Sequence, residues 1–157
     1  DWLSPCPEAR IYAAPGLEEK RPDLTIAGTL TDEAEAGWAD TIEQVLVEGF
    51  PMASEVVFFH RPSKTLIATD LAFNIGPRSP AVTRFAFRLA RSYGRLGPTF
   101  IERMMIRDRD AFARSLRRIL EWPFERVIVS HGEVVETGGR AKLERGYAQI
   151  LGGSPGI

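Results

Sequence analysis

The sequence holds little of the chemistry that most metal centres and nucleophilic sites need. Its 157 residues include 1 cysteine and 2 histidines. A single cysteine, Cys6, cannot form an internal disulfide, and we expect it to be a small buried residue rather than a nucleophile. A closed four-ligand zinc site built from cysteine and histidine is excluded, because it needs more of these ligands than the chain contains. The low cysteine count favours a reducing, cytoplasmic location.

Other signatures are missing as well. No apolar run approaches the roughly 20 residues that span a bilayer, so we expect no membrane segment. The Gly-x-Gly-x-x-Gly fingerprint and the Gly-x-x-x-x-Gly-Lys-Ser/Thr phosphate loop are both absent. A nucleotide-binding fold of either type therefore has no support from the sequence.

What the chain does contain is typical of one folded domain. Hydrophobic residues make up 44% and charged residues 26% of the sequence, which are ordinary values for a globular protein. A chain of 157 residues is long enough for a single hydrophobic core. We expect residues 1–151 to form this domain and the glycine-rich residues 152–157 to be a flexible tail.

The net charge of -1 conceals an uneven distribution. Residues 1–78 carry 6 basic and 13 acidic side chains, whereas residues 79–118 carry 10 basic and 3 acidic ones. Four arginines recur at helical spacing in the basic part: Arg84, Arg88, Arg91 and Arg95. Such a stripe could bind nucleic acid or a small anion, but it is also the solvated face that an amphipathic helix requires. The second interpretation is simpler, and we expect no nucleic-acid partner.

Local periodicity predicts a mixed α/β (α+β) fold. The predicted strands cover residues 11–14, 42–47, 55–59, 65–68 and 126–130. A turn that contains Pro62 joins two of them into a hairpin and holds the exposed histidine His60. Because Val127, Ile128 and Val129 are consecutive β-branched residues, we expect the last strand to be covered on both faces.

Helical periodicity dominates from residue 81 onwards. We predict helices over residues 81–93, 99–105 and 140–151, and a further one that starts at Asp108 or Asp110 and stops before Pro123. The apolar positions expected to pack in the interior are Val82, Phe85, Ala86, Leu89, Phe100, Met104, Met105, Phe112, Leu116, Ile119 and Leu120.

Two residues form the candidate site. Asp70 ends the apolar run 65–69, and His131 ends the run 127–130. Ligands of open α/β sheets bind beyond the carboxyl ends of the strands, so we expect both side chains at one edge. A carboxylate oxygen and an imidazole nitrogen are ligands of zinc, iron or manganese. On spacing alone, a structural hydrogen bond that closes the strand ends is the simpler interpretation of the same pair.

The order of the motifs resembles the metallo-β-lactamase superfamily. More narrowly, the chain resembles the carboxy-terminal part of an uncharacterised branch of predicted bacterial hydrolases, a domain of unknown function. The resemblance rests on segments spread over most of the chain: residues 9–17, 20–24, 55–62, 65–73 and 115–133. It implies an αββα sandwich whose amino-terminal part is missing, with a one- or two-metal centre at one edge of its sheets.

The resemblance also implies roles for individual residues. Asp70 matches the aspartate that commonly bridges two metals, and His131 matches the histidine of the terminal Gly-His-Gly-like turn. No histidine stands near Phe50, where the superfamily usually has one, and the His-x-His-x-Asp-His cluster would precede Asp1. The implied centre is therefore incomplete or degenerate.

Two functions follow from the resemblance. The first is a metal-dependent hydrolase that acts on a small molecule and uses a divalent metal, zinc before iron or manganese. The alternative is a non-catalytic module of the same fold that binds a small anion or a protein partner. A missing amino-terminal part would also leave a sheet edge exposed, which favours a homo-oligomer.

Overall fold

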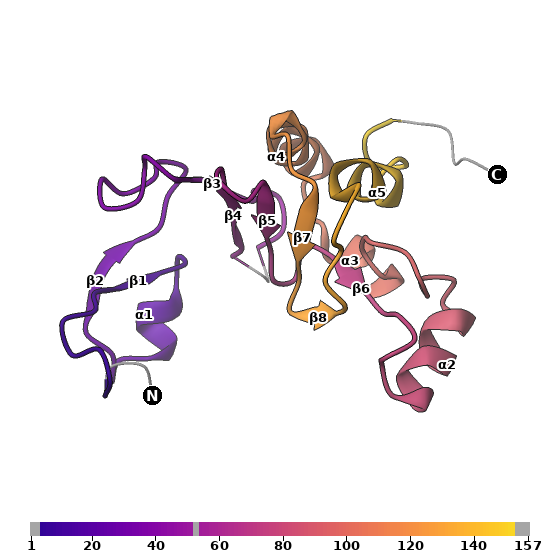
Figure 1. Cartoon of the computed structure of the whole chain (residues 1–157), viewed down its shortest axis with the longest axis horizontal. Coiled ribbons are helices and arrows are strands. Elements are labelled where there is room, and N and C mark those ends of the chain that lie inside the picture. The colour runs from indigo at the N-terminus through magenta and orange to yellow at the C-terminus, as the bar shows by residue number, and fades with distance from the viewer. Residues whose placement is uncertain (1–3, 52–53, 153–157) are drawn as a thin grey trace.

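The computed structural model describes residues 4–51 and 54–152. Over these residues the chain is a mixed α/β structure whose strands form three sheets (Figure 1). Within the described part, no helix is long and apolar enough to cross a bilayer. The predicted tail at 152–157 lies, apart from Gly152, outside the described residues.

A four-stranded sheet with the order β3-β4-β5-β7 forms the centre of the molecule. Its strands are β3 (Ile42–Leu46), β4 (Val56–His60), β5 (Thr65–Ile67) and β7 (Arg126–Ile128). The pairs β3-β4 and β4-β5 are antiparallel, whereas β5-β7 is parallel. The predicted hairpin is confirmed, because Phe58 pairs with Ile67 and His60 with Thr65.

Two short parallel pairs flank this sheet. Strand β1 (Ile11–Ala13) pairs with β2 (Ile26–Thr29), and α1 (Leu17–Lys20) connects them. Strand β6 (Phe73–Asn74) pairs with β8 (His131–Gly132). The prediction did not include β2, β6 or β8. Strands β6 and β8 have two residues each, and the sequence of β2 is Ile-Ala-Gly-Thr, so none of the three has enough large apolar side chains to produce a period-two pattern.

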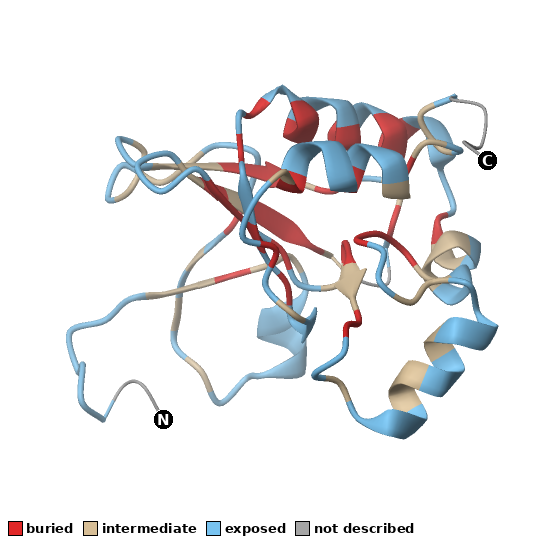
Figure 2. Cartoon of the chain, turned by 45° about the vertical axis from the view of Figure 1, so that its right-hand side comes forward, coloured by how far each residue is buried: buried red, intermediate tan, exposed pale blue. Residues whose placement is uncertain are grey.

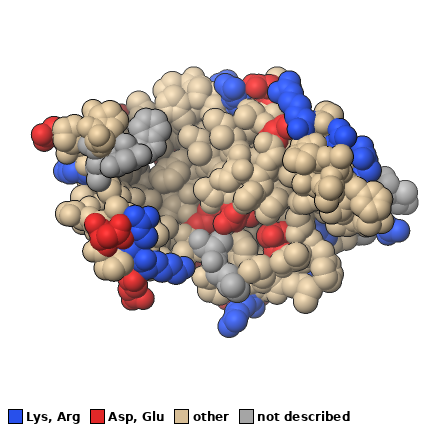
Figure 3. All heavy atoms as spheres, turned by 90° about the horizontal axis from the view of Figure 1, so that it is seen from below, with Lys and Arg blue, Asp and Glu red and all other residues tan. Residues whose placement is uncertain are grey.

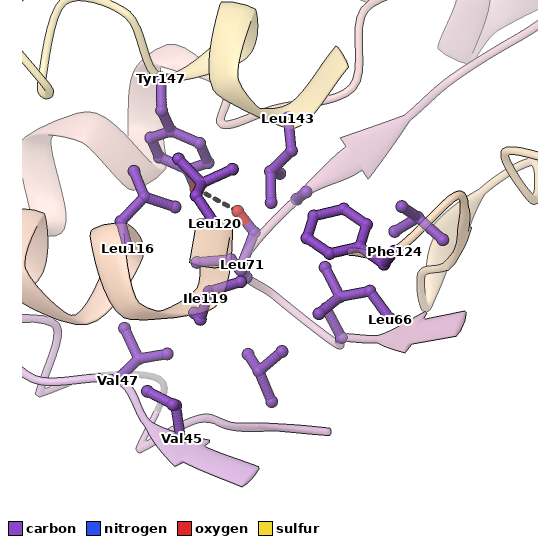
Figure 4. Packing of buried hydrophobic residues seen from close by; sticks show 14 of the residues in the cluster. Val45, Val47, Leu66, Leu71, Leu116, Ile119, Leu120, Phe124, Leu143 and Tyr147 are labelled. Carbon is purple, nitrogen blue, oxygen red and sulfur yellow. Dashed lines mark hydrogen bonds between the residues drawn. The ribbon is translucent and has the colours of Figure 1, made fainter. Parts of the chain in front are cut away.

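The core lies between the central sheet and two helices, α4 (Arg109–Glu121) and α5 (Gly139–Gly146). Helix α4 packs on β3 and α5 on β7, and Figure 4 shows their apolar side chains meeting above the strands. The predicted interior positions of α4 are confirmed, since Phe112, Leu116 and Ile119 are 1% exposed or less. Asp108 caps this helix by accepting hydrogen bonds from the N–H groups of Asp110 and Ala111.

The helices α2 (Ala81–Leu89) and α3 (Phe100–Met105) contain no buried residue, and α2 lies at the right-hand end of the molecule in Figure 1. Figure 2 shows buried residues on the central sheet and on α4, and none on α2. The prediction that α2 and α3 pack their apolar positions in the interior is wrong for six of them, which stay exposed: Val82 (81%), Phe85 (63%), Ala86, Leu89 (73%), Phe100 (67%) and Met104 (70%). Only Met105 packs against the core as expected.

The cause is the orientation of α2. Its inward side carries half-buried Thr83, Arg84 and Phe87, and the Phe87 ring lies 6.1 Å from the Phe73 ring. The arginine-bearing side of the helix therefore turns partly towards the molecule. Because an amphipathic pattern indicates two faces but not their neighbours, the sequence could not decide this orientation.

Two smaller predictions are also wrong. Strand β7 is not covered on both faces: Val127 is fully buried, whereas Arg126 and Ile128 are exposed. This strand lies at the edge of the sheet, where only the face under α5 is packed. Cys6 is exposed rather than buried, because it lies in the irregular segment that precedes β1.

Candidate metal centre

Asp70 and His131 lie together at one edge of the central sheet. Their strands, β5 and β7, are parallel neighbours, so the chain leaves both at the same edge. His131 Nε2 lies 3.2 Å from Asp70 Oδ1, although the two residues are 61 positions apart. The side chains are 50% and 49% exposed, so solvent and solutes reach the pair. The predicted convergence is confirmed.

Buried groups on both sides of Asp70 hold its backbone in place. The Thr69 N–H donates a hydrogen bond of 2.5 Å to Glu55 Oε1. Leu71 is 1% exposed, and its carbonyl accepts a hydrogen bond from the buried Tyr147 hydroxyl, which Figure 4 shows as a dashed line. Burial raises the pKa of Tyr147 well above its ordinary value, which keeps this donor protonated. Asp70 is therefore presented from a rigid segment.

Glu55 is a member of the site that the sequence analysis missed. It is 3% exposed, and burial raises its pKa to about 6, an effect to which the nearby charge of Asp70 adds. Its Oε2 atom has no hydrogen-bond partner among the described residues. Continuing the hairpin register beyond Phe58 and Ile67 places Glu55 opposite Asp70. An acidic residue at the head of an apolar strand was the signal that could have identified it.

His131 is held by strand pairing and by an aromatic contact. It pairs with Phe73 between β8 and β6, and the two rings stack with centroids 4.8 Å apart and planes 9° apart. The next residue, Gly132, has a φ of 122°, and a Cβ atom there would clash with the Asn74 carbonyl. Only glycine allows β8 to approach β6 this closely. The imidazole is therefore fixed in orientation beside Asp70.

A pocket of about 440 Å³ opens next to the imidazole. Strand β6, the start of α2 and the segment that follows β7 form its walls, with these side chains among the lining groups: Phe73, Arg78, Thr83, Phe87, His131 and Glu133. Glu133 Oε1 accepts a hydrogen bond of 2.6 Å from the Arg78 N–H, which ties two of these walls together. The volume suits a small molecule.

The pair fits part of a divalent metal site. Two ligands about 2.1 Å from a tetrahedral zinc ion lie roughly 3.4 Å from each other, close to the separation of the imidazole nitrogen and the carboxylate oxygen. The described residues nevertheless contain no group of three or more His, Cys, Asp or Glu side chains that could hold a metal. The second histidine, His60, lies at the opposite end of the hairpin from Asp70, with its Nδ1 2.7 Å from Ser63 Oγ. Asp70 and His131 alone would therefore be fewer than the three protein ligands that a catalytic zinc centre normally uses.

Solved structures that share this fold include metallo-β-lactamases. A crystal structure of the DIM-1 metallo-β-lactamase is 16% identical with a TM-score of 0.53, and the match covers 96% of this chain and 59% of that one. A metallo-β-lactamase from Pontibacter korlensis is 14% identical with a TM-score of 0.53, and the match covers 98% of this chain and 62% of that one.

The chain thus spans about three fifths of the length of these enzymes. No protein-family model and no curated protein matches it, so the narrower branch named above stays a prediction. The chain has the metallo-β-lactamase fold, as the order of its motifs implied.

Proposed function

We propose that this chain is part of a metal-dependent hydrolase in which Asp70 and His131 hold a divalent metal ion. The observation that supports the proposal most strongly is the approach of these two side chains to 3.2 Å, at a half-exposed edge beside a pocket of about 440 Å³. An oxygen and an imidazole nitrogen suit zinc, and also iron or manganese. The remaining ligands come from residues outside the described part of the chain.

Different residues of the chain would bind the metal, orient its ligands and receive the substrate. Asp70 supplies a carboxylate oxygen and His131 the Nε2 atom of a neutral imidazole, while Phe73 holds the plane of that ring. The pocket beyond the imidazole receives a small-molecule substrate. A divalent metal bound there polarises a carbonyl or phosphoryl oxygen and lowers the pKa of a bound water.

The two histidines make a direct test possible, because each gives its own imidazole signals in a nuclear magnetic resonance spectrum. Titration of the metal-free chain with Zn²⁺ is expected to shift the His131 signals. Those of His60, which lies in the hairpin turn region, are expected to stay in place. In Asp70→Asn the Zn²⁺ concentration needed for the shift should rise at least about tenfold, because one of two protein ligands is lost.

Three results would contradict the proposal. They are His131 signals that do not move at millimolar Zn²⁺, a shift that is unchanged in Asp70→Asn, and equal shifts at both histidines. An unmoved His131 would leave the pair as a hydrogen bond that closes the sheet edge, and would favour the non-catalytic module of the same fold.

The hydrolytic part of the proposal has a separate test. In the resembled superfamily a His-x-His-x-Asp-His cluster supplies further ligands, and it would be encoded upstream of Asp1. The gene sequence before this codon should contain that cluster, and the longer protein should hydrolyse an ester or lactone in the presence of Zn²⁺. The cytoplasmic location and the homo-oligomer stay predictions.

A further inference from the structure

A second pocket, of about 710 Å³, lies on the other face of β6. Phe73 and Ile75 line the pocket beside His131, whereas Asn74 lines the second one. Successive residues of a strand point to opposite faces, so the strand separates the two pockets. The segment after β8 divides in the same way, with Glu133 on the first pocket and Val134 on the second. The second pocket is therefore not part of the Asp70–His131 site.

Five basic side chains line this second pocket: Arg91, Arg95, Arg103, Lys142 and Arg145. They come from α3, α5 and the loop after α2, which are separate parts of the sequence. Figure 3 shows Lys and Arg side chains along the upper right-hand edge of that view, towards the side on which α2 lies in Figure 1, and a second group of them beside acidic side chains on the left.

The positive charge of the pocket is not neutralised by its own walls. The one acidic residue among the described lining residues is Glu136, and Arg126, which does not line the pocket, lies 3.1 Å from its Oε2. None of the ion pairs among the described residues joins one of the five basic side chains to a carboxylate. Cations gathered without an anionic partner repel one another, and a bound anion relieves this repulsion.

This arrangement changes the interpretation of the arginine stripe. Arg84 donates a hydrogen bond of 2.8 Å to the Pro77 carbonyl, and the Arg88 guanidinium stacks 4.2 Å above the Tyr93 ring. Helix α2 ends at Leu89, so Arg91 and Arg95 lie beyond it and line the pocket. Arg88, Arg91 and Arg95 are exposed, as a solvated face requires, but only Arg84 and Arg88 belong to the helix. Arg91 and Arg95 are therefore available to a ligand.

We infer that this pocket binds a small phosphorylated molecule of nucleotide size. Arginine presents a planar fork of donors that fits phosphate oxygens, and four of the five basic side chains are arginines. The volume of about 710 Å³ is far larger than one inorganic phosphate needs, and it lies within the range of small-molecule sites. Leu96, Pro98 and Val135 form an apolar wall for the organic part.

The test is isothermal titration of the full chain with ADP, inorganic pyrophosphate and adenosine. A chelator is present throughout, so that the outcome does not depend on the proposed metal centre. ADP and pyrophosphate should bind, more weakly as salt is added, whereas adenosine should not. Arg95→Gln and Arg145→Gln should each raise the dissociation constant of ADP about tenfold, since each removes a charge-assisted contact.

The matched control is Arg117→Gln, which removes the same charge from an exposed position on α4 away from the pocket. Its ADP affinity should stay within twofold of the parent. The inference fails if neither ADP nor pyrophosphate binds, or if Arg117→Gln weakens binding as much as the pocket variants do. It also fails if single-stranded RNA binds and ADP does not displace it, because the basic surface would then serve a nucleic acid. Loss of Zn²⁺ binding with ADP binding retained would reject the proposed function and leave this inference standing.

Discussion

Helices α4 and α2 have similar amphipathic patterns, but only α4 buries its apolar side. Helix α4 buries its apolar side, with Leu116 and Phe112 each 1% exposed. Helix α2 leaves its apolar side in solvent, with Leu89 73% and Phe85 63% exposed. The comparison teaches that hydrophobic periodicity predicts a helix and its two faces, but not which face meets a neighbour.

The difference follows from how each helix is attached. Helix α4 is capped by Asp108. The N–H groups of Arg107 and Asp108, just before the helix, donate hydrogen bonds to the carbonyl of Gly49, which lies in the segment after β3. Helix α2 starts after Pro80 without a side-chain cap, and it contacts the molecule through Phe87 and Arg84. We therefore expect α2 to open at a lower free energy than α4.

The largest effect is expected in the core under α4. Leu116→Ala should lower the free energy of unfolding by about 3 kcal/mol, because it removes buried methyl groups and leaves a cavity between α4 and the sheet. Denaturation by urea, monitored by circular dichroism, measures the change. If the free energy of unfolding fell by less than about 1 kcal/mol, Leu116 would not be packed in the core as its burial indicates.

An intermediate effect is expected from the buried carboxyl of Glu55. Its folded-state pKa of about 6 lies above the ordinary 4.5, so the folded state binds this proton more tightly than the unfolded state does. This tighter proton binding adds about 2 kcal/mol to the free energy of unfolding. The contribution is fully present below pH 4.5 and is lost as the pH rises through about 6.

Glu55→Gln should therefore remove this loss. Unfolding by urea at several pH values, with a chelator present, should show the variant gaining stability relative to the parent chain between pH 4.5 and pH 7. The control is Glu144→Gln, which makes the same change at an exposed carboxyl on α5 and measures what the substitution itself does to stability. If the free energies of unfolding of Glu55→Gln and the parent differ by the same amount at every pH in this window, burial does not raise the pKa of this carboxyl.

The smallest effect is expected on α2. Leu89→Ala is the same chemical change as Leu116→Ala, but at a side chain that is 73% exposed, and it should alter the free energy of unfolding by less than about 0.5 kcal/mol. The same urea experiment measures it. If the two leucine variants lost equal stability, the apolar side of α2 would be covered in solution, and the contrast between the helices would disappear.

Much of the candidate site was predictable because it depends on strand ends. Asp70 and His131 each follow an apolar run, and parallel strands bring such residues to one edge. Glu55, Phe73 and Gly132 were not predicted as site residues. Each acts on a residue that is not its neighbour in the sequence. Glu55 accepts a hydrogen bond from a backbone N–H across the hairpin, and Phe73 stacks on the imidazole of another strand. Gly132 leaves room for a backbone carbonyl that a Cβ atom would strike.

The sequence by itself determined where the main helices and the central hairpin lie, because capping, proline and hydrophobic periodicity act between residues close together in the chain. Only the tertiary structure decided that α2 exposes its apolar side, that Glu55 is buried beside Asp70 and that basic residues from three segments share one pocket. These outcomes depend on distances between segments that are remote in sequence, and no local pattern encodes such distances.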